Sequence, residues 1–394
     1  MNRTDRTVDV LVVGAGPAGL ALAARAAQAG AGRVEVLERD ERPGGVPRHC
    51  HHRGGFGLLR GPEYAGRAVA AALDAGAAVR TGVTATGWAG PLTLETTSPA
   101  GLERITARAV VLATGARERP RSARLVPGTR PAGVLTTGEL QQSLHPVGRR
   151  AVLVGAEPVA RHAARLLRRA GTQAAAMLTE HPHGTALPGI PLLTRTTVTA
   201  LHGRGRLTGV AVRHQDGRSG VIACDTVVFT GDWIPDHELA RRGGITLDPG
   251  TRGPSVDPSF RTSAPGVFAV GNALRGIEPA ATAAAEGAAA APAVLAHLSG
   301  TPWPVPGPAL LADPPLFWLT PNHLTASATR PLLLRSREPL TAPLIRARQD
   351  GRLLWHRRFP ARVGPDRSLR LPPGWTTRVD RAGGPVVLSV LSRG

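Results

Sequence analysis

Four residues that can bind metals or move protons stand side by side in the chain: His49, Cys50, His51 and His52. Near neutral pH, histidine can act as a general base, a general acid or a metal ligand. A zinc or iron site needs ligands that converge from a helical i, i+4 spacing or from separate elements, and four adjacent residues rarely do so. We therefore predict no metal site in this run. Two roles stay open: a solvated basic loop, or a loop beside a bound cofactor in which His51 or His52 moves a proton.

The number and spacing of the cysteines limit redox chemistry at the same place. Cys50 and Cys224 are the only cysteines, and the chain has no CxxC or CxxxxC pair. A dithiol relay needs a second thiol that can resolve the first, so no two-cysteine mechanism is expected. So few cysteines are typical of a reducing compartment. The most apolar long segment, Pro279–Leu298, contains Glu286 and Pro292, which argues against a membrane span. We expect a soluble, cytoplasmic protein.

The elements that would position such chemistry begin near the start of the chain. An apolar strand, Val8–Val13, is followed by an alanine-rich helix that ends near Gln28 and by a second strand, Arg33–Leu37. The segment GAGPAG, residues 14–19, joins the first strand to the helix. A strand, a glycine turn, a helix and a second strand in this register predict a dinucleotide site of the Rossmann kind.

Each residue of the motif has a physical role. Gly14 permits a tight turn, Gly16 lets the backbone approach a pyrophosphate, and Gly19 lets the helix pack closely on the strand. The helix N-terminus adds N–H groups and a partial positive charge. Glu38, at the end of the second strand, can accept hydrogen bonds from a ribose diol. An acid at this position favours an unphosphorylated adenosine ribose, as in FAD or NAD.

The formal charge of +20 would by itself suggest nucleic-acid binding. All 48 basic residues are arginine, however, and they are scattered through every segment. The chain has no recognition motif, and aromatic residues, at 3%, are too few for base stacking. We therefore predict no nucleic-acid partner. The absence of lysine also excludes Schiff-base and Walker-type chemistry.

Two later segments extend the first motif. AVVLATGARERP, residues 109–120, reads as a buried strand that ends in ATG. TSAPGVFAVGNALRGIEPAATAAAEG, residues 262–287, reads as a strand followed by Gly271-Asn272 and a long helix. Together the three motifs resemble the flavoprotein family with two dinucleotide domains that includes the pyridine nucleotide-disulfide oxidoreductases. The resemblance covers residues 8–298 and implies an FAD-dependent oxidoreductase whose first site holds FAD.

The resemblance also assigns FAD contacts to individual positions. They are Gly14, Gly16 and Gly19 at the pyrophosphate, Glu38 at the adenosine ribose, Gly44 and Gly45 in a loop that passes the flavin, Gly115 near the adenosine, and Gly271 and Asn272 at the ribityl end. The family usually has Asp where this chain has Asn272, which keeps an acceptor oxygen but removes a charge. The helix after Pro279 would direct N–H groups toward the flavin pyrimidine edge.

The fold implied by the resemblance is α/β, with two interleaved Rossmann-like dinucleotide-binding domains in three layers. Residues 1–120 and 223–300 would form the FAD-binding domain, and residues 121–222 the second domain. A proline-rich linker, TPWPVPGP, then leads to residues 301–394, where short apolar runs alternate with turn signals such as Asp350-Gly351. This part lies outside the resemblance, and we predict a small, antiparallel, β-rich C-terminal domain.

The second dinucleotide motif departs from the family. Residues 149–180 repeat the strand, turn, helix and strand, but Glu157 replaces the middle glycine. Its side chain would block backbone approach, and its charge would repel a pyrophosphate. NAD(P) binding therefore stays open between two interpretations. Either Glu157 points away and NADH or NADPH binds with Glu180 at its ribose, or the unit is a scaffold or holds another ligand, which we favour.

The segments GARERP, from Gly115, and VPG, from Val126, narrow the resemblance further. They look like the FAD subunits of multi-subunit dehydrogenases: opine oxidase, hydrogen cyanide synthase and dye-linked proline dehydrogenase. The resemblance implies a dehydrogenase or dehydrogenase subunit that oxidises a small amine, amino acid or hydroxy acid, without a redox disulfide. It implies two partners, a small iron–sulfur protein and a second flavin subunit. Two alternatives remain, an NAD(P)H-dependent flavin reductase and a non-catalytic subunit that holds FAD for assembly.

Overall fold

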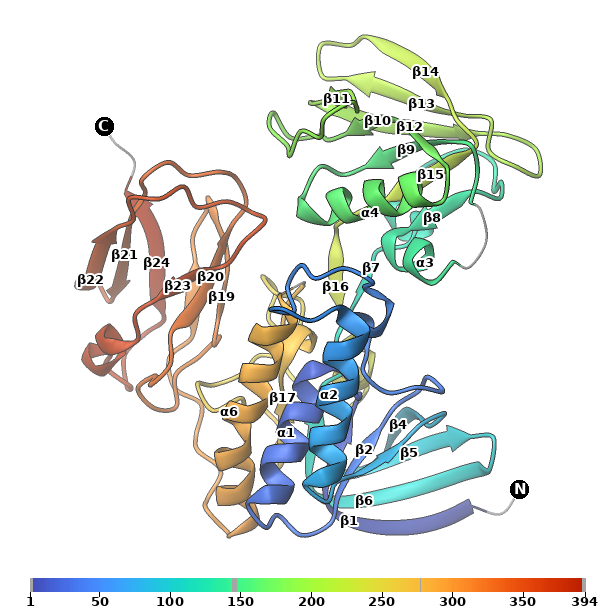
Figure 1. The fold of residues 1–394 in the computed structure, drawn as a ribbon. Helices are drawn as coiled ribbons and strands as arrows, with labels where there is room; N and C mark the ends of the chain where they lie inside the picture. Colours follow the sequence, from blue (N-terminus) through green and yellow to red (C-terminus); the bar gives the residue numbers. More distant parts are fainter. Residues whose placement is uncertain (1–2, 144–146, 277, 392–394) are drawn as a thin grey trace. The chain divides into compact units, whose positions relative to one another are not determined.

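The chain folds into two compact units, and one of them is inserted in the other. The computed structural model describes residues 3–143, 147–276 and 278–391. One unit comprises residues 1–116 and 234–394, and the other comprises residues 117–233. Two short strands, β7 (Ala116–Glu118) and β16 (Trp233–Pro235), lie where the chain passes from one unit to the other. The predicted α/β fold of two interleaved Rossmann-like units with a β-rich C-terminal part is confirmed (Figure 1).

The first unit is built on parallel strands in the order β3-β2-β1-β6-β17. Strand β6 is long enough to carry antiparallel neighbours as well, so β5 and β4 extend from it as a meander. Helices α1 and α6 lie side by side next to this sheet, and α2 packs on α1 (Figure 1). The bounds are β1 (Arg3–Val13), α1 (Pro17–Gln28), β2 (Val34–Leu37), α2 (Gly61–Asp74), β3 (Ala78–Arg80), β4 (Thr84–Gly90), β5 (Thr93–Ser98), β6 (Gly101–Leu112), α5 (Glu238–Arg242), β17 (Val267–Ala269) and α6 (Ala280–Leu298).

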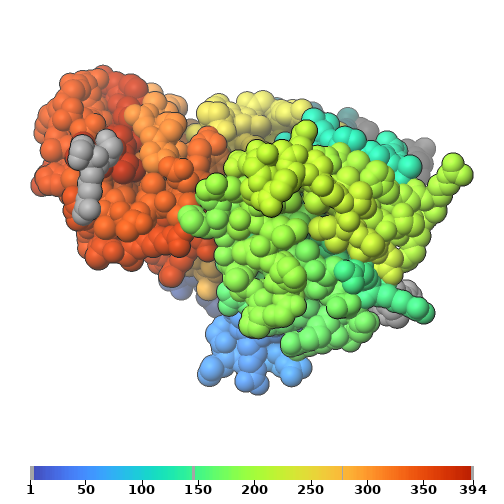
Figure 2. Space-filling view, turned by 90° about the horizontal axis from the view of Figure 1, so that it is seen from above, coloured from blue at the N-terminus to red at the C-terminus, as the bar shows by residue number. Residues whose placement is uncertain are grey.

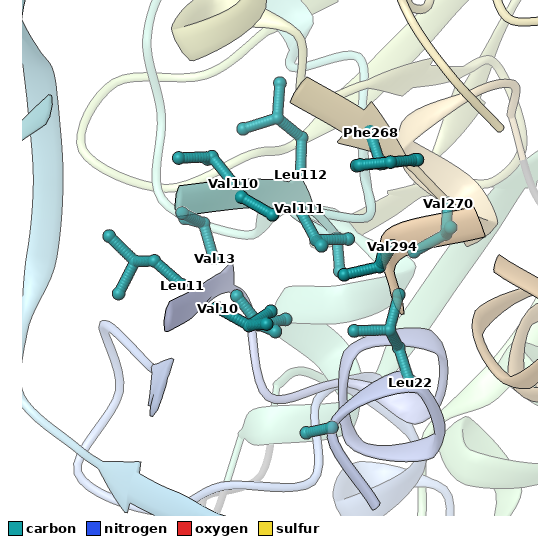
Figure 3. Close-up of a cluster of buried hydrophobic side chains, with 14 of the residues drawn as sticks. Val10, Leu11, Val13, Leu22, Val110, Val111, Leu112, Phe268, Val270 and Val294 are labelled. Atoms are coloured by element: carbon teal, nitrogen blue, oxygen red, sulfur yellow. The ribbon is translucent and has the colours of Figure 1, made fainter. Parts of the chain in front are cut away.

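The core of this unit explains why its central strands read as nearly continuous apolar runs. Residues Val10–Val13 of β1 and Val110–Leu112 of β6 meet Leu22, Phe268 and Val294 from α1, β17 and α6 (Figure 3). Parallel strands that are covered on both faces need apolar residues at every position. Each fully buried side chain of this size contributes about 1.5–3 kcal/mol. The cluster therefore anchors the carboxyl ends of β1 and β6, where the nucleotide turn begins.

The second unit repeats the same plan. Its parallel strands have the order β11-β10-β9-β15-β8, and an antiparallel meander, β12-β13-β14, accompanies them. Helix α4 packs beside β9 and β10, and α3 contacts α4. The bounds are β8 (Val134–Thr136), α3 (Thr137–Gln142), β9 (Arg150–Val154), α4 (Pro158–Arg169), β10 (Gln173–Leu178), β11 (Leu192–Leu193), β12 (Thr196–His202), β13 (Gly209–His214), β14 (Ser219–Ala223) and β15 (Thr226–Phe229).

The C-terminal segment has two sheets around a hydrophobic core of its own, with the orders β18-β24-β21-β22 and β19-β20-β23. Its surface forms one compact mass, orange to red in Figure 2. The hairpin expected at Asp350-Gly351 is confirmed, because β21 and β22 pair across these residues. The expectation of a wholly antiparallel segment is wrong, because β18 runs parallel to β24. The bounds are β18 (Leu310–Ala312), β19 (Leu316–Thr320), β20 (Leu332–Ser336), β21 (Leu344–Gln349), β22 (Arg352–Arg358), β23 (Leu369–Leu371) and β24 (Val386–Leu391).

Candidate dinucleotide site

The glycine turn after β1 leaves open space at its centre. Gly14 has φ +108°, which favours glycine, and a Cβ there would collide with the backbone of Ala113. Gly16 is the N-cap of α1, with φ −83° and ψ −177°. Among the described residues, only its chain neighbours come within 4 Å of where its Cβ would be. Because no side chain caps α1, the first N–H groups of the helix can bind an anion. The turn therefore has the space and the donors that a pyrophosphate needs.

The acid predicted at the end of β2 reaches this turn. Glu38 is buried, and its carboxylate accepts hydrogen bonds from the N–H of Ala15, at 3.1 Å, and of Asp40, at 3.0 Å. An ionised carboxylate offers about four acceptor positions, so two further hydrogen bonds can still be made. Glu38 is thus fixed beside the turn with acceptor capacity left for a ribose diol.

A second pair of glycines packs against the same turn. The N–H of Gly44 donates to the carbonyl of Ala15 at 2.8 Å, and a Cβ on Gly45 would lie 2.9 Å from the Cα of Gly16. Gly45 also has φ +62°, so a side chain there would be both strained and crowded. The structure therefore brings the predicted glycine pair into direct contact with the predicted phosphate turn.

The histidine run continues from this glycine pair and packs on the start of α2. A short 3-10 turn, Val46–His49, begins the run. A Cβ on Gly61, the first residue of α2, would collide with the carbonyl oxygens of Pro47 and Cys50. The N–H of Gly61 also donates to the carbonyl of Cys50, at 3.1 Å. The run is therefore tied by its backbone to α2.

A row of rings connects the histidine run to the beginning of α6. His51 is exposed and His52 is half-buried. The centre of the His52 ring lies 5.7 Å from that of Phe56, and the Phe56 ring lies 5.6 Å from that of Tyr64. The Tyr64 hydroxyl donates to the carbonyl of Ala280, the first residue of α6, at 3.4 Å. In the part of the chain that the structure describes, no three His, Cys, Asp or Glu side chains are placed to hold a metal ion.

Neither cysteine is activated as a nucleophile. Burial raises the pKa of the Cys50 thiol to about 11, and burial together with the nearby Asp225 raises the pKa of Cys224 to about 11. The Cys50 thiol donates to the carbonyl of Val46, at 3.5 Å. Because the thiolate is the reactive form, both thiols stay protonated and inert near neutral pH.

The loop before α6 forms another side of the site. A Cβ on Gly271 would lie 2.6 Å from the Cβ of Ala18 in α1, so this loop packs tightly on α1. The Asn272 amide nitrogen donates to the carbonyl of Glu278, at 3.3 Å, and its oxygen accepts from the N–H of Glu278, at 3.0 Å. Asn272 therefore uses both ends of its amide to close the loop, and its contact with the ribityl end of FAD stays a prediction.

Gly115 follows β6 and is connected through Asp236 to Arg39, the residue after Glu38. Its carbonyl accepts from the N–H of Asp236, at 2.8 Å, and the Thr114 hydroxyl donates to the carbonyl of Asp236, at 2.6 Å. The Asp236 carboxylate in turn lies 3.3 Å from Arg39. Neither Asp236 nor Arg39 was singled out from the sequence, since no motif marks them. The structure thus gathers the residues expected at the adenosine end of the site.

The matching turn of the second unit is filled by its own side chain. Glu157 is the N-cap of α4, with φ −81° and ψ 169°, nearly the backbone conformation of Gly16. A Cβ on Gly155 would lie 2.7 Å from Glu157 Oε2, and one on Gly231 would lie 2.6 Å from Glu157 Oε1. The carboxyl group therefore lies between the turns that follow β9 and β15. These residues do not fit a dinucleotide pyrophosphate, which would need the same space.

The protonation of Glu157 bears on how it blocks the turn. Burial raises the pKa of Glu157, and hydrogen bonds from Thr230 and from the turn backbone oppose this shift only in part. The carboxyl group is therefore easier to protonate than an exposed glutamate. The side chain therefore fills the turn whether or not its carboxyl group is charged.

A fold of two Rossmann-like units with an open glycine turn after the first strand is that of a dinucleotide-binding oxidoreductase. Residues 8–287 match the family described as pyridine nucleotide-disulphide oxidoreductase, and the chain belongs to this family. A subunit of opine oxidase from Agrobacterium tumefaciens is 29% identical over 349 residues, which are 74% of this chain and 66% of that protein. Ferredoxin–NADP reductase of Salinispora tropica is 29% identical over 287 residues, 67% of this chain and 85% of that protein.

A solved structure agrees with the fold. The crystal structure of T. acidophilum thioredoxin reductase has a TM-score of 0.62 at 25% identity, and the match covers 75% of this chain and 98% of that one. With its family, this protein is an FAD-dependent oxidoreductase, and the family binds FAD and NAD(P). Among the described helices, none is long and apolar enough to cross a membrane.

Proposed function

We propose that the first turn holds FAD and that the chain acts as a dehydrogenase, or as the FAD subunit of one. Its substrate would be a small organic molecule such as an amine, an amino acid or a hydroxy acid. The observation that carries this proposal is the contrast between Gly16, which leaves room for a pyrophosphate, and Glu157, which fills the same room in the second unit. With its second dinucleotide turn filled, the enzyme would draw its electrons from a substrate other than a nicotinamide.

The chain's own residues would hold FAD in the following way. The N–H groups at the start of α1 would bind the pyrophosphate against Gly14, Gly16 and Gly19, while Glu38 would accept hydrogen bonds from the adenosine ribose. Gly44-Gly45 would lie over the pyrophosphate, since this pair already packs on Gly16. Gly115, Gly271 and Asn272 would complete the site.

A proton acceptor is needed beside the reacting bond. FAD, when bound, would accept a hydride and pass the electrons on. We assign the accompanying proton to His51 or His52, because an imidazole can accept a proton from an amine or hydroxyl group near neutral pH. The ring contacts from His52 through Phe56 to Tyr64 support this role, since Tyr64 contacts the beginning of α6.

The name of one relative supports the proposal that this chain works with partner subunits. The opine oxidase relative is by its name one subunit of an enzyme with several. We propose that this chain also works with partners, and the resemblance described from the sequence implies a small iron–sulfur protein and a second flavin subunit. The chain spans only 66% of that relative's length, so its activity is not transferred with the name.

A second candidate function is an NAD(P)H-dependent flavin reductase. The similarity to ferredoxin–NADP reductase favours it, because this chain covers 85% of that protein. The position of Glu157 argues against the reductase function, because its side chain would have to leave the turn before a dinucleotide could bind.

The visible spectrum of the purified protein separates these functions. We expect a flavin band that persists on anaerobic addition of NADH or NADPH and bleaches with a panel of amines, amino acids or hydroxy acids. Bleaching by NADH or NADPH would support the reductase function and contradict our proposal. A band that no donor bleaches, even with a candidate partner subunit present, would instead support a subunit that holds FAD without catalysis.

A further inference from the structure

A pocket of about 90 Å³ lies beside the first two turns of α6, and residues 256–260, which include Asp257, and the C-terminal segment form its other walls. Helix α6 contributes Thr282, Ala285 and Glu286 to its walls, and the C-terminal segment contributes Thr320 and Arg370 among others. Both sides belong to the first compact unit. The pocket shares no lining residue with the proposed FAD contacts, so it is a separate feature of the molecule.

Two buried polar atoms of this pocket have no hydrogen-bond partner among the described residues: Oε2 of Glu286 and Oγ1 of Thr320. The Glu286 side chain is only 9% exposed, and Thr320 is 6% exposed. A buried polar atom without a partner costs about 1–3 kcal/mol, so such atoms are rare in native proteins unless a ligand or water satisfies them. Two of them in one pocket leave acceptor positions that a hydrogen-bond donor, from a polar ligand or from water, would satisfy.

The other side of Glu286 is fixed by buried charges. The guanidinium of Arg275, which is fully buried, donates to Glu286 Oε1. Arg275 Nε lies 4.0 Å from Oε1 of Glu278, and Arg335 lies 2.6 Å from the same oxygen. Arg275 and Arg335 also lie over the ring of Trp318, at 5.7 and 5.0 Å. This neutral cluster of two acids and two bases holds Glu286 in one orientation, with its second oxygen left for a donor.

Two exposed arginines are among the residues that line the pocket. Arg330 and Arg370 both line it and are exposed, and neither makes an ion pair with another described residue. Burial raises the pKa of Glu286, and the positive charges of Arg275 and Arg330 oppose this shift. Guanidinium groups bind carboxylates through paired N–H donors. The pocket thus combines a buried acceptor for a cation with exposed donors for a carboxylate.

We propose that this pocket binds the amino-acid head of the substrate, with its ammonium at Glu286 and Thr320 and its carboxylate at Arg330 and Arg370. A pocket of about 90 Å³ is several times the roughly 10–15 Å³ that one water molecule needs, so it has room for the head of a small amino acid. The inference rests on the proposed dehydrogenase function, because only that function makes the bound amino acid a substrate.

The position of the pocket restricts the substrate further. Glu286 lies six residues beyond Ala280, the first residue of α6, which is about 9 Å along the helix. The flavin edge is proposed to face the N-terminus of α6. A molecule held by its head at Glu286 must therefore extend for several bonds before it reaches the flavin. We infer an elongated amino-acid derivative whose oxidised bond is distant from the head.

Calorimetric titration of the FAD-loaded full chain with three small probes tests the pocket without relying on turnover. L-alanine carries both charged groups, propionate only the carboxylate, and n-propylamine only the ammonium. We expect L-alanine to bind at least tenfold more tightly than either of the others, without bleaching the flavin. Equal binding of all three, or no binding of L-alanine, would overturn the proposal.

Variants locate the binding. Thr320→Val and Arg370→Ala should each weaken L-alanine binding at least fivefold, while Arg352→Ala, an exposed arginine on β22, should leave it unchanged. Glu286→Gln should weaken it most, but this change also alters the partner of buried Arg275, so near-UV circular dichroism must first show a native fold. Undiminished binding to both Thr320→Val and Arg370→Ala would overturn the assignment.

The pocket and the proposed function can fail separately. If L-alanine binds as expected and no amino-acid derivative bleaches the flavin, the function fails and the pocket stands. If derivatives bleach the flavin equally well in wild type, Thr320→Val and Arg370→Ala, the function stands and the pocket is not the substrate site.

Discussion

The two turns that follow β1 and β9 have nearly the same backbone and opposite properties. Each connects a central parallel strand to a helix, each begins with a glycine of positive φ, and each helix has proline at its first position. The N-cap conformations of Gly16 and Glu157 differ only slightly. Yet Gly16 leaves open space, whereas the carboxyl group of Glu157 fills the matching space between Gly155 and Gly231.

A Rossmann turn can thus keep the same backbone conformation with either a glycine or a glutamate at the helix N-cap. Strand, turn and helix of the second unit pack around a hydrophobic core of their own. We propose that binding depends on the volume and charge of the single side chain at the N-cap. Changing that residue and its neighbours in each turn should therefore change dinucleotide binding in a predictable direction.

The largest effect is expected when the first turn is given the residue of the second. Gly16→Glu requires no new backbone conformation, since Glu157 has nearly the same φ and ψ. The carboxylate would face the FAD pyrophosphate, and like charges at this range cost on the order of 3 kcal/mol, roughly a hundredfold in affinity. The variant should be purified without flavin, as measured by absorbance at 450 nm in proportion to protein.

A control separates this effect from a general cost of adding charge. Gly220→Glu places the same side chain on an exposed glycine of β14 that also has open space around it. It should retain a full complement of flavin. Full flavin in Gly16→Glu would mean that the pyrophosphate does not lie at this turn.

Removing the charge of Glu38 should weaken FAD binding less, by roughly thirtyfold. The carboxylate accepts from two backbone N–H groups and is expected to accept from the ribose as well. A hydrogen bond to a charged group contributes about 2 kcal/mol. In Glu38→Gln, the side-chain NH₂ group would face an N–H group and could not accept a hydrogen bond from it. Fluorescence titration of the apoprotein with FAD measures the change. The same titration of Glu41→Gln, an exposed neighbour, should match wild type.

A smaller effect is expected where the glycine pair packs on the first turn. Gly45→Ala would place a Cβ 2.9 Å from Gly16, whereas Gly55→Ala, in the same loop and also at positive φ, meets open space. Both changes carry the strain of positive φ, about 1 kcal/mol. Only Gly45→Ala should also weaken FAD binding, by about fivefold, in the same titration. Equal affinities for the two variants would show that close packing at Gly45 does not shape the site.

The smallest expected effect is a pH dependence in the second turn. Burial raises the pKa of Glu157, so between the ordinary glutamate pKa and the raised value the folded chain binds more protons than the unfolded chain. Stability is therefore lost as pH rises through this window, at up to about 1.4 kcal/mol per pH unit. The midpoint temperature of unfolding of Glu157→Gln should therefore increase relative to that of wild type as pH rises. A gap that stays constant with pH would show that Glu157 ionises freely.

Local motifs explain why much of the first site was predictable. Glycines 14, 16 and 19, the helix from Pro17 and the acid after β2 depend on spacing within one segment, and their structure follows the expectation. The Asp350-Gly351 pair likewise predicted the hairpin, because its signal is confined to a few residues.

Contacts between distant residues could not be predicted in the same way. In the sequence, Glu286 is only a charged residue within an apolar helix. Its pairing with the buried Arg275 depends on how the loop before α6 packs against that helix. Glu278 and Arg335 are separated by 57 residues and meet only because the C-terminal segment packs on α6. Such pairs depend on tertiary packing, which no local spacing records.

Binding of NADH to Glu157→Gly, compared with wild type and Glu157→Gln, tests most directly that one side chain closes the second turn. Fluorescence of the bound dihydronicotinamide measures it under anaerobic conditions. Because volume matters as well as charge, we expect weak binding to wild type and to Glu157→Gln, and at least tenfold tighter binding to Glu157→Gly. Tight binding to wild type, or no gain in Glu157→Gly, would contradict the role assigned to Glu157.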